Sequence, residues 1–492
     1  MSFTIHNSKR SLFYFCIALL VCFGLNLDIF KDYAFLDAYE LIYTADRVDN
    51  FHSLFIENGR PLYGLWCEYL YGYFFETITE LKWPRAFATI CCIIFSTQLF
   101  KFLTSIGFKT FESAIFALLV LTLPTFTVYF AWSTTSQIPL LLITNFYAGE
   151  LLLRGFSKEK TLWQLVIISL LLVLTSMFLY QSTATTFILP FLIKTIKTND
   201  FNLKVVKKFI AFTFVCYLLY YLLFKLTIVV SGLEAANRTS PNLLIFIKKI
   251  IKFFLFELRT LVKSSGFLLF PKLAFAAGII SFFGFFIIKI KQNISLYFSI
   301  SLVLILLFCY SPYLLSSQNY FSLRTISTTA VVVLFYQFYF IRHLVLKFEK
   351  LKFGVPFLAI TLLILSFFNQ RKYVAGLQHK EYAILKKAFE DFDINNVDKL
   401  TIIIPKHEHL QQYGNLKNGF SDEFGHLSSA RDWAPNHLFS QIKWEQKKSK
   451  TKEEVFPVRN IIVLKTDDTL KNYDLDNTIN LEPLFEAKFP KQ

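Results

Sequence analysis

The sequence carries little charge for its length. Only 17% of its 492 residues are Asp, Glu, Lys or Arg, whereas 54% are hydrophobic and 18% are aromatic. This composition excludes an ordinary soluble domain, which needs a charged surface. Apolar runs such as "ESAIFALLVLTLPTFTVYFAW" approach or exceed the roughly 18 residues typical of a membrane-spanning helix. The sequence therefore predicts a mainly α-helical, polytopic membrane protein.

Cysteine is absent from the polar C-terminal region, and the seven cysteines of the chain lie in or beside apolar segments. This distribution argues against a disulfide scaffold and against a Cys/His zinc site. The sequence contains no Gly-rich phosphate loop, no G-x-S-x-G and no H-E-x-x-H. We expect no resident cofactor or metal, and dependence on a divalent metal stays open. Four histidines of the C-terminal region are interpreted as surface residues: His407, His409, His426 and His437.

Short basic segments separate the apolar runs and account for much of the net charge of +16. They fall on alternate connections, which predicts that these loops face the cytoplasm and that the chain starts inside and ends outside. A basic stripe with interleaved aromatics is missing, so we expect no nucleic acid partner. About eleven spans are predicted, near 12–30, 84–101, 110–130, 136–154, 161–180, 182–197, 207–230, 265–289, 295–311, 323–345 and 353–370. We interpret the first apolar run as a retained helix, because it lacks a small-residue cleavage site.

Three polar pieces then share the outer face: the loop 31–83, the segment 231–264 and the tail. In the tail, "KLTIIIP" (399–405) and "NIIVLKT" (460–466) predict strands, and "KEYAILKKAFEDF" (380–392) predicts a helix. We therefore predict a transmembrane domain over 1–371 and a small extracytoplasmic α/β domain over 372–492.

The first outer loop is rich in ionisable residues, as its stretch "DYAFLDAYELIYTADRVDNFHSLFIENGRPLYGLW" (32–66) shows. Asp37 follows the first helix closely, and ionisable groups near the membrane boundary tend to face cavities or substrate paths. The segment 57–75 is dense enough in aromatic and apolar residues for an interfacial helix. A carboxylate here can act as general base toward a sugar hydroxyl. A nearby Arg can hold a phosphate.

These features resemble the GT-C superfamily of polyprenyl-phosphate-sugar glycosyltransferases, and most closely the bacterial serotype-converting O-antigen glucosyltransferases. That family carries a pair of acids after the first helix, followed by a Gly-Arg-Pro element. Asp37 matches the first acid and 59–61 match the second element, whereas position 38 is Ala. The resemblance implies a catalytic carboxylate, with Asp37, Glu40 and Asp46 as the candidates.

The resemblance further implies transfer of a glucose-like sugar from a polyprenyl-phosphate donor to a cell-surface glycan such as O-antigen, by inverting attack. The active site would face the periplasm from the bacterial inner membrane. The expected partners are this donor, the glycan acceptor and the bilayer, with a flippase and a donor-synthesising enzyme. The candidate phosphate ligands are Arg60, Arg324, Arg259, Lys263 and Arg238.

Other interpretations of the sequence stay open. The main alternative is a transporter or flippase of a lipid-linked saccharide, although the acids cluster in a loop and not at mid-span. A scaffolding protein and another lipid-phosphate transferase are the remaining two. Lys248 and Lys249 are interpreted as lipid-headgroup contacts. The segment "DEFGHLSSARDW" (422–433) is similar to a pattern of related bacterial membrane proteins, and we interpret it as a packing element.

Overall fold

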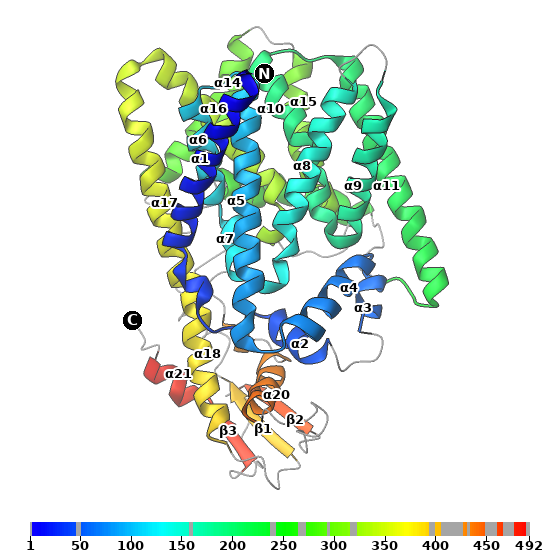
Figure 1. Ribbon diagram of the computed structural model, residues 1–492, viewed down its shortest axis with the longest axis vertical. Coiled ribbons are helices and arrows are strands. Elements are labelled where there is room, and N and C mark those ends of the chain that lie inside the picture. Colours follow the sequence, from blue (N-terminus) through cyan, green and yellow to red (C-terminus); the bar gives the residue numbers. More distant parts are fainter. Residues whose placement is uncertain are drawn as a thin grey trace.

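Helices make up most of this computed structural model, with a small sheet near the C-terminus (Figure 1). The N-terminal end of the chain and the first loop lie at opposite ends of the helical bundle (Figure 1). The structure describes residues 2–45, 51–156, 161–236, 243–263, 272–292, 296–314, 322–392, 399–404, 427–430, 433–447, 460–465 and 477–488.

A helix lies at each predicted span. The bundle contains α1 (Ser2–Leu25), α5 (Lys82–Ser105), α6 (Thr110–Leu121), α7 (Pro124–Ala131), α8 (Gln137–Phe156), α9 (Trp163–Tyr180), α10 (Leu189–Thr198), α11 (Leu203–Ser231), α14 (Lys272–Lys291), α15 (Leu296–Leu314), α16 (Ser327–Lys347) and α17 (Gly354–Tyr373).

Within the described residues, five helical stretches are long and apolar enough to cross a membrane, and a bent pair, α6 and α7 at 58°, makes up to six. The total of eleven spans and their orientation stay predictions. The five stretches are Ile78–Ser105, Trp163–Thr198, Leu203–Ser231, Ser327–Lys347 and Gly354–Glu390.

The chain reverses after α9. Ser169 of α9 donates a hydrogen bond to Ala148 O (3.0 Å), and Asn145 donates to Thr183 O (3.1 Å), so both arms touch the same part of α8. The backbone is extended at Tyr180 (φ −159°, ψ 99°), where the reversal begins. The 3₁₀ helix 181–188 and α10 therefore return along α8, opposite in direction to α9. Whether each arm crosses the membrane stays a prediction.

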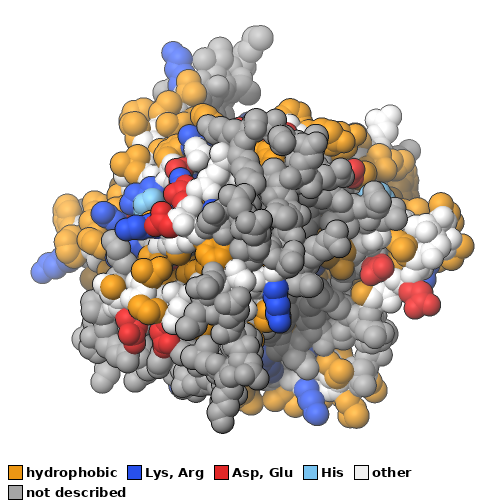
Figure 2. All heavy atoms as spheres, turned by 90° about the horizontal axis from the view of Figure 1, so that it is seen from below, with side chains coloured by type: hydrophobic (Ala, Val, Ile, Leu, Met, Phe, Trp, Pro, Cys, Tyr) orange, Lys and Arg blue, Asp and Glu red, His pale blue; other side chains and the backbone are white. Residues whose placement is uncertain are grey.

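The first loop forms short helices that cover the end of the bundle. Tyr33 donates a hydrogen bond to Ala131 O (3.0 Å), and Tyr63 donates to Thr134 O (2.9 Å). The uncharged connection 133–137 is fully buried beneath this loop. Figure 2 views the molecule from this end and shows acidic and basic side chains among hydrophobic ones. The short helices of the first loop are α2 (Asp37–Thr44), α3 (Ser53–Glu57) and α4 (Pro61–Tyr69).

The C-terminal region folds as a small α/β unit at the same end (Figure 1). Its three parallel strands have the order β2-β1-β3, with Leu400 opposite Ile461 and Thr401 opposite Thr478. The predicted strands at 399–405 and 460–466 and the predicted helix at 380–392 are confirmed, whereas β3 was not predicted. The elements are α18 (Ala375–Glu390), β1 (Lys399–Ile404), α20 (Trp433–Lys447), β2 (Asn460–Lys465), β3 (Thr478–Asn480) and α21 (Glu482–Lys488).

Candidate functional site

The structure brings together two of the predicted site residues, Asp37 and Arg324. Asp37 is the first residue of α2, and its Oδ2 lies 3.9 Å from Nη1 of Arg324. The Arg324 guanidinium lies 4.3 Å above the ring of Trp132, which is fully buried. Tyr129 holds the backbone of the same residue through a hydrogen bond to Arg324 O (2.9 Å). The Asp37 side chain is 45% exposed, so this ion pair is open to a substrate.

Asp37 follows a strained turn. Leu36 has φ 45° and ψ −115°, a region that non-glycine residues rarely adopt. Such a conformation costs about 1–3 kcal/mol and persists only where the surroundings fix it. The Leu36 N–H donates a hydrogen bond to Ser428 Oγ (3.0 Å) in the C-terminal unit. Local strain is therefore held next to the candidate base by a distant part of the chain.

A buried arginine fixes the segment before this turn. The Arg85 guanidinium donates hydrogen bonds to Ile29 O (2.8 Å), Lys31 O (2.7 Å) and Tyr33 O (2.7 Å). It also lies 3.8 Å above the Tyr33 ring, and Arg85 is only 1% exposed. Buried carbonyl groups need hydrogen-bond donors. Arg85 supplies these donors to a stretch of backbone that forms no regular helix or sheet. It thereby sets the path of the chain from α1 to α2.

The other two candidate carboxylates have different outcomes. Glu40 lies one helical turn after Asp37, on the same face of α2. Burial, and to a lesser extent the charge of Asp37, raise the pKa of Glu40 above its ordinary value. The family pattern's second acid is missing at position 38, but the helix places another acid beside the first. Asp46 lies outside the described residues.

Arg60 lies apart from this pair, on a rigid support of its own. Its Nε donates to Gln181 Oε1 (2.7 Å), and its guanidinium lies 4.7 Å from the centre of the Tyr180 ring. Gly59 has φ 73°, and a Cβ atom there would collide with the Tyr220 hydroxyl, which donates to Gly59 O (3.0 Å). This explains the glycine of the Gly-Arg-Pro element. No carboxylate pairs with Arg60 among the described residues.

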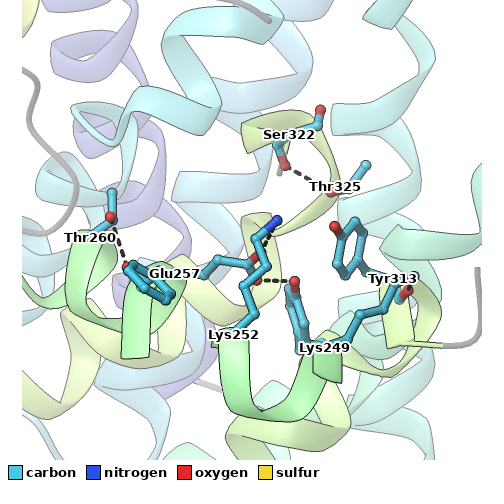
Figure 3. A network of polar contacts seen from close by, with 9 residues as sticks. Lys249, Lys252, Glu257, Thr260, Tyr313, Ser322 and Thr325 are labelled. Carbon is cyan, nitrogen blue, oxygen red and sulfur yellow. Dashed lines mark hydrogen bonds and ion pairs between the residues drawn. The ribbon is translucent and has the colours of Figure 1, made fainter. Parts of the chain in front are cut away.

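A second charged network, shown in Figure 3, lies on α12 (Leu243–Lys252) and the turn that follows it. Lys252 Nζ lies 3.5 Å from Glu257, which is 3% exposed and accepts a hydrogen bond from Tyr310. Lys249 donates to Tyr313 O (2.9 Å) and is 1% exposed. The prediction that Lys249 contacts lipid headgroups is therefore wrong, because Tyr313 covers its ammonium group.

The remaining predicted cations are not brought to Asp37 by any described contact. Arg259 is exposed on α13 (Leu258–Val262), and Lys263 is half-buried at its end. Arg238 lies outside the described residues, as do three of the four C-terminal histidines. His437 is half-buried beside the ring of Tyr43. No group of three or more His, Cys, Asp or Glu side chains suited to a metal ion occurs in the described part of the chain.

Sequence reasoning missed three side chains of this site: Arg85, Trp132 and Ser428. Arg85 stands in "KWPRAF" at the start of an apolar helix, where an arginine is readily taken for a lipid anchor. Trp132 immediately precedes the uncharged connection 133–137. A large aromatic residue at this position only weakly indicates that the end of the bundle is packed. Ser428 belongs to the "SSARDW" segment, which the sequence suggested only as a packing element.

The fold and the site define a class: a protein of apolar helices suited to a membrane, with a partly exposed acid–cation pair, Asp37 and Arg324, at one end of the bundle. A family model described as "Glucosyl transferase GtrII" matches residues 41–335. This range covers more than half of the chain, so the protein belongs to the GtrII glucosyl transferase family, and the resemblance found in the sequence is confirmed. No curated protein and no solved structure matches the chain.

The matched range includes Arg60, Arg324 and the second charged network. Asp37 and Glu40 immediately precede it, and the C-terminal α/β unit follows it. The family match therefore assigns a glucosyl transfer activity to the chain, whereas the roles of individual residues are argued from the geometry.

Proposed function

We propose that this glucosyltransferase moves a glucose-like sugar from a polyprenyl-phosphate donor to a cell-surface glycan such as O-antigen. The reaction takes place at the outer face of the bacterial inner membrane, with Asp37 as general base. The family match is the observation that carries this proposal. The open Asp37–Arg324 pair at the end of the bundle supports the choice of base.

The proposed step is an in-line displacement. The acceptor hydroxyl gives its proton to the Asp37 carboxylate as the acceptor oxygen forms its bond to the anomeric carbon. The bond from that carbon to the phosphate oxygen breaks, and its electron pair leaves with the polyprenyl phosphate. The configuration at the anomeric carbon inverts, because attack and departure occur on opposite faces.

We propose different roles for the two arginines. In inverting glycoside hydrolases, the groups that serve the nucleophile and the leaving group lie roughly 6.5–9.5 Å apart, on opposite sides of the sugar. Arg324 lies only 3.9 Å from Asp37 and so is too close to the base to hold the departing phosphate in this arrangement. We therefore propose that Arg324 orients Asp37, while Arg60 binds the phosphate. Arg60 uses only its Nε in the described contacts, which leaves its two Nη groups for a bidentate phosphate contact.

The surroundings of Arg60 favour this assignment. The Tyr180 ring and Gln181 hold its side chain in one orientation, so less conformational entropy is lost when phosphate binds. Both supporting residues lie at the reversal after α9, where Tyr180 is buried and Gln181 is half-buried. A guanidinium with a fixed orientation is suited to binding the donor phosphate while the sugar is transferred.

Purified protein tests the proposal directly. Wild-type protein in detergent, given polyprenyl-phosphate glucose and the surface glycan of its host bacterium, is expected to form glucosylated glycan. A flippase would form none, because detergent removes the two leaflets between which it works. Folded protein that makes no product under these conditions would overturn the transferase assignment.

Cells provide the complementary test. Deletion of the gene is expected to remove one sugar branch from the surface glycan, and Asp37→Asn is expected to do the same at normal protein levels. A tag inserted in the loop 31–83 should be accessible from the periplasm. Cytoplasmic accessibility of that tag would contradict the proposed location.

A further inference from the structure

The C-terminal α/β unit touches the first loop at the point where Asp37 begins. Ser428 Oγ accepts the hydrogen bond from Leu36 N–H (3.0 Å) and lies 2.6 Å from Gln378 Oε1, to which it donates. A serine hydroxyl has one proton to give and accepts in return, so both contacts use a single group. Ser428 and Gln378 are completely buried and Leu36 is 4% exposed. Water therefore cannot replace Ser428 without rearrangement.

A buried carboxylate holds this serine in place. Glu381 accepts hydrogen bonds from the N–H groups of Ser428 (2.8 Å) and Ser429 (2.7 Å), and from Ser429 Oγ (2.5 Å). Glu381 is 0% exposed, so these three donors take the place of its hydration shell. We call Gln378, Glu381, Ser428 and Ser429 the serine clamp. Its donors come from the "SSARDW" segment and its acceptors from α18.

The same unit also holds the two ends of the loop. His379 Nδ1 lies 2.9 Å from Asp32 O, before the strained turn. At the far end, Gln441 donates to Glu76 O (2.7 Å), and Glu445 accepts from the N–H of Ile78 (2.8 Å). Figure 1 shows α20 beneath α2 at this end of the molecule, with α18 beside α20. The first loop is thus tied to the C-terminal unit before, at and after the candidate base.

We propose that Ser428, Ser429 and Glu381 are positioning residues for glucosyl transfer, which hold the strained turn at Leu36 so that Asp37 meets the acceptor hydroxyl. The proposal rests on the proposed function, since it assigns Asp37 as the base. The clamp is buried, and it acts through the backbone of Leu36. A displacement of the base by about 1 Å can cost about 100-fold in rate. The C-terminal unit therefore contributes to turnover and not only to packing.

The test combines kinetics with hydrogen exchange on the full-length protein in detergent. Ser428→Ala is expected to lower kcat about 10- to 100-fold with little change in the KM for polyprenyl-phosphate glucose. Exchange of the Leu36 amide, followed in the peptide 32–44, should become faster. Ser428→Thr keeps a hydroxyl and should restore both properties in large part. Glu381→Gln should resemble Ser428→Ala, because an amide cannot accept from all three donors.

A matched control lies on the same helix. Lys386 forms an exposed i,i+4 pair with Glu390 (3.7 Å), so Lys386→Ala should leave kcat, KM and Leu36 exchange unchanged. Faster exchange in Ser428→Ala with unchanged kcat would overturn the positioning role. Wild-type activity that persists in Asp37→Asn would instead overturn the proposed base. Because exchange is read without substrate, the two failures are distinguishable.

Discussion

The two charged networks of this protein differ in access. The Asp37–Arg324 pair joins side chains that are 45% and 16% exposed, across 3.9 Å. The Lys252–Glu257 pair spans 3.5 Å; Lys252 is 39% exposed, but the carboxylate of Glu257 is only 3% exposed and accepts a hydrogen bond from Tyr310. An open pair contributes only about 0–1 kcal/mol to stability and can exchange partners with a substrate. A buried carboxylate such as Glu257 is committed to the fold, because its removal leaves the buried Tyr310 hydroxyl without its acceptor.

This comparison separates residues of similar chemistry into those that serve function and those that serve structure. Both networks contain an acid and a cation, and the acid of each lies in an outer segment predicted from the sequence. The difference lies in what covers them. Tyr310 and Tyr313 pack against the second network, whereas the strained turn at Leu36 presents Asp37 at the surface of its loop. Substitutions in each network should therefore affect different measurements.

The largest effect is expected for Asp37→Asn. Removing a general base typically costs about 10²–10⁴-fold in rate, so glucosyl transfer should fall by about that factor. The thermal midpoint of the protein should stay nearly unchanged, because the pair is open and contributes little to folding. Activity assays with purified protein and a thermal melt check both parts. Turnover within a few-fold of wild type would remove Asp37 from the mechanism.

The opposite pattern is expected for Glu257→Ala. Removing Glu257 leaves the buried Tyr310 hydroxyl without its acceptor, which costs about 1–3 kcal/mol, so the unfolding midpoint and the yield of folded protein should drop. The turnover per folded molecule should change little. Thermal melts and activity normalised to folded protein measure the two effects. A fully folded variant with lost turnover would show that the second network belongs to the active site.

The third prediction separates the two arginines. Arg60→Gln removes the proposed phosphate ligand and should raise the KM for the lipid donor about 10- to 100-fold, the effect of a lost charged hydrogen bond. Arg324→Gln should lower kcat instead, since Arg324 orients the base. Steady-state kinetics over donor concentration distinguish them. A donor KM effect in Arg324→Gln alone would exchange the assigned roles.

Much of the fold was predictable because it depends on local patterns. Apolar runs mark the helices, and short β-branched runs such as "KLTIIIP" mark strands; the strand formed here, β1, is buried on both faces. β3 was not predicted, because a strand of three residues is too short to show alternation of apolar and polar positions. Asp37 was predicted as a site residue from its position in an apolar stretch of the first loop. Arg324 was predicted from its position at the start of a helix. Their contact emerged only from the fold.

The missed contacts join residues far apart in the chain. Leu36 and Ser428 are separated by 392 positions, and no periodicity or motif in one predicts the other. Lys249 was misread for a related reason. Its apolar neighbours indicate an interfacial helix, but its partner Tyr313 lies 64 residues away and covers it. The sequence indicates which residues can ionise, and tertiary packing decides which of them remain accessible.

The smallest effect is expected for Glu40→Gln. Burial and the charge of Asp37 raise the pKa of Glu40 in the folded protein, so ionisation of Glu40 costs folding free energy. This cost is absent below about pH 4, where the carboxyl is protonated in folded and unfolded chains alike. It is fully present once the pH exceeds the raised pKa. Glu40→Gln should therefore melt at a slightly higher temperature than wild type near neutral pH, and the difference should vanish in acid.

Turnover is the second property to measure for Glu40→Gln. If Asp37 is the base, Glu40→Gln keeps most of the wild-type turnover, and Asp37→Asn measured in parallel serves as the inactive reference. If Glu40 were the base instead, turnover would decline in acid with a midpoint above the ordinary pKa of a carboxyl group, because the pKa of Glu40 is raised. If Glu40→Gln lost turnover, and its remaining activity no longer declined at acid pH, the base would be Glu40 and not Asp37.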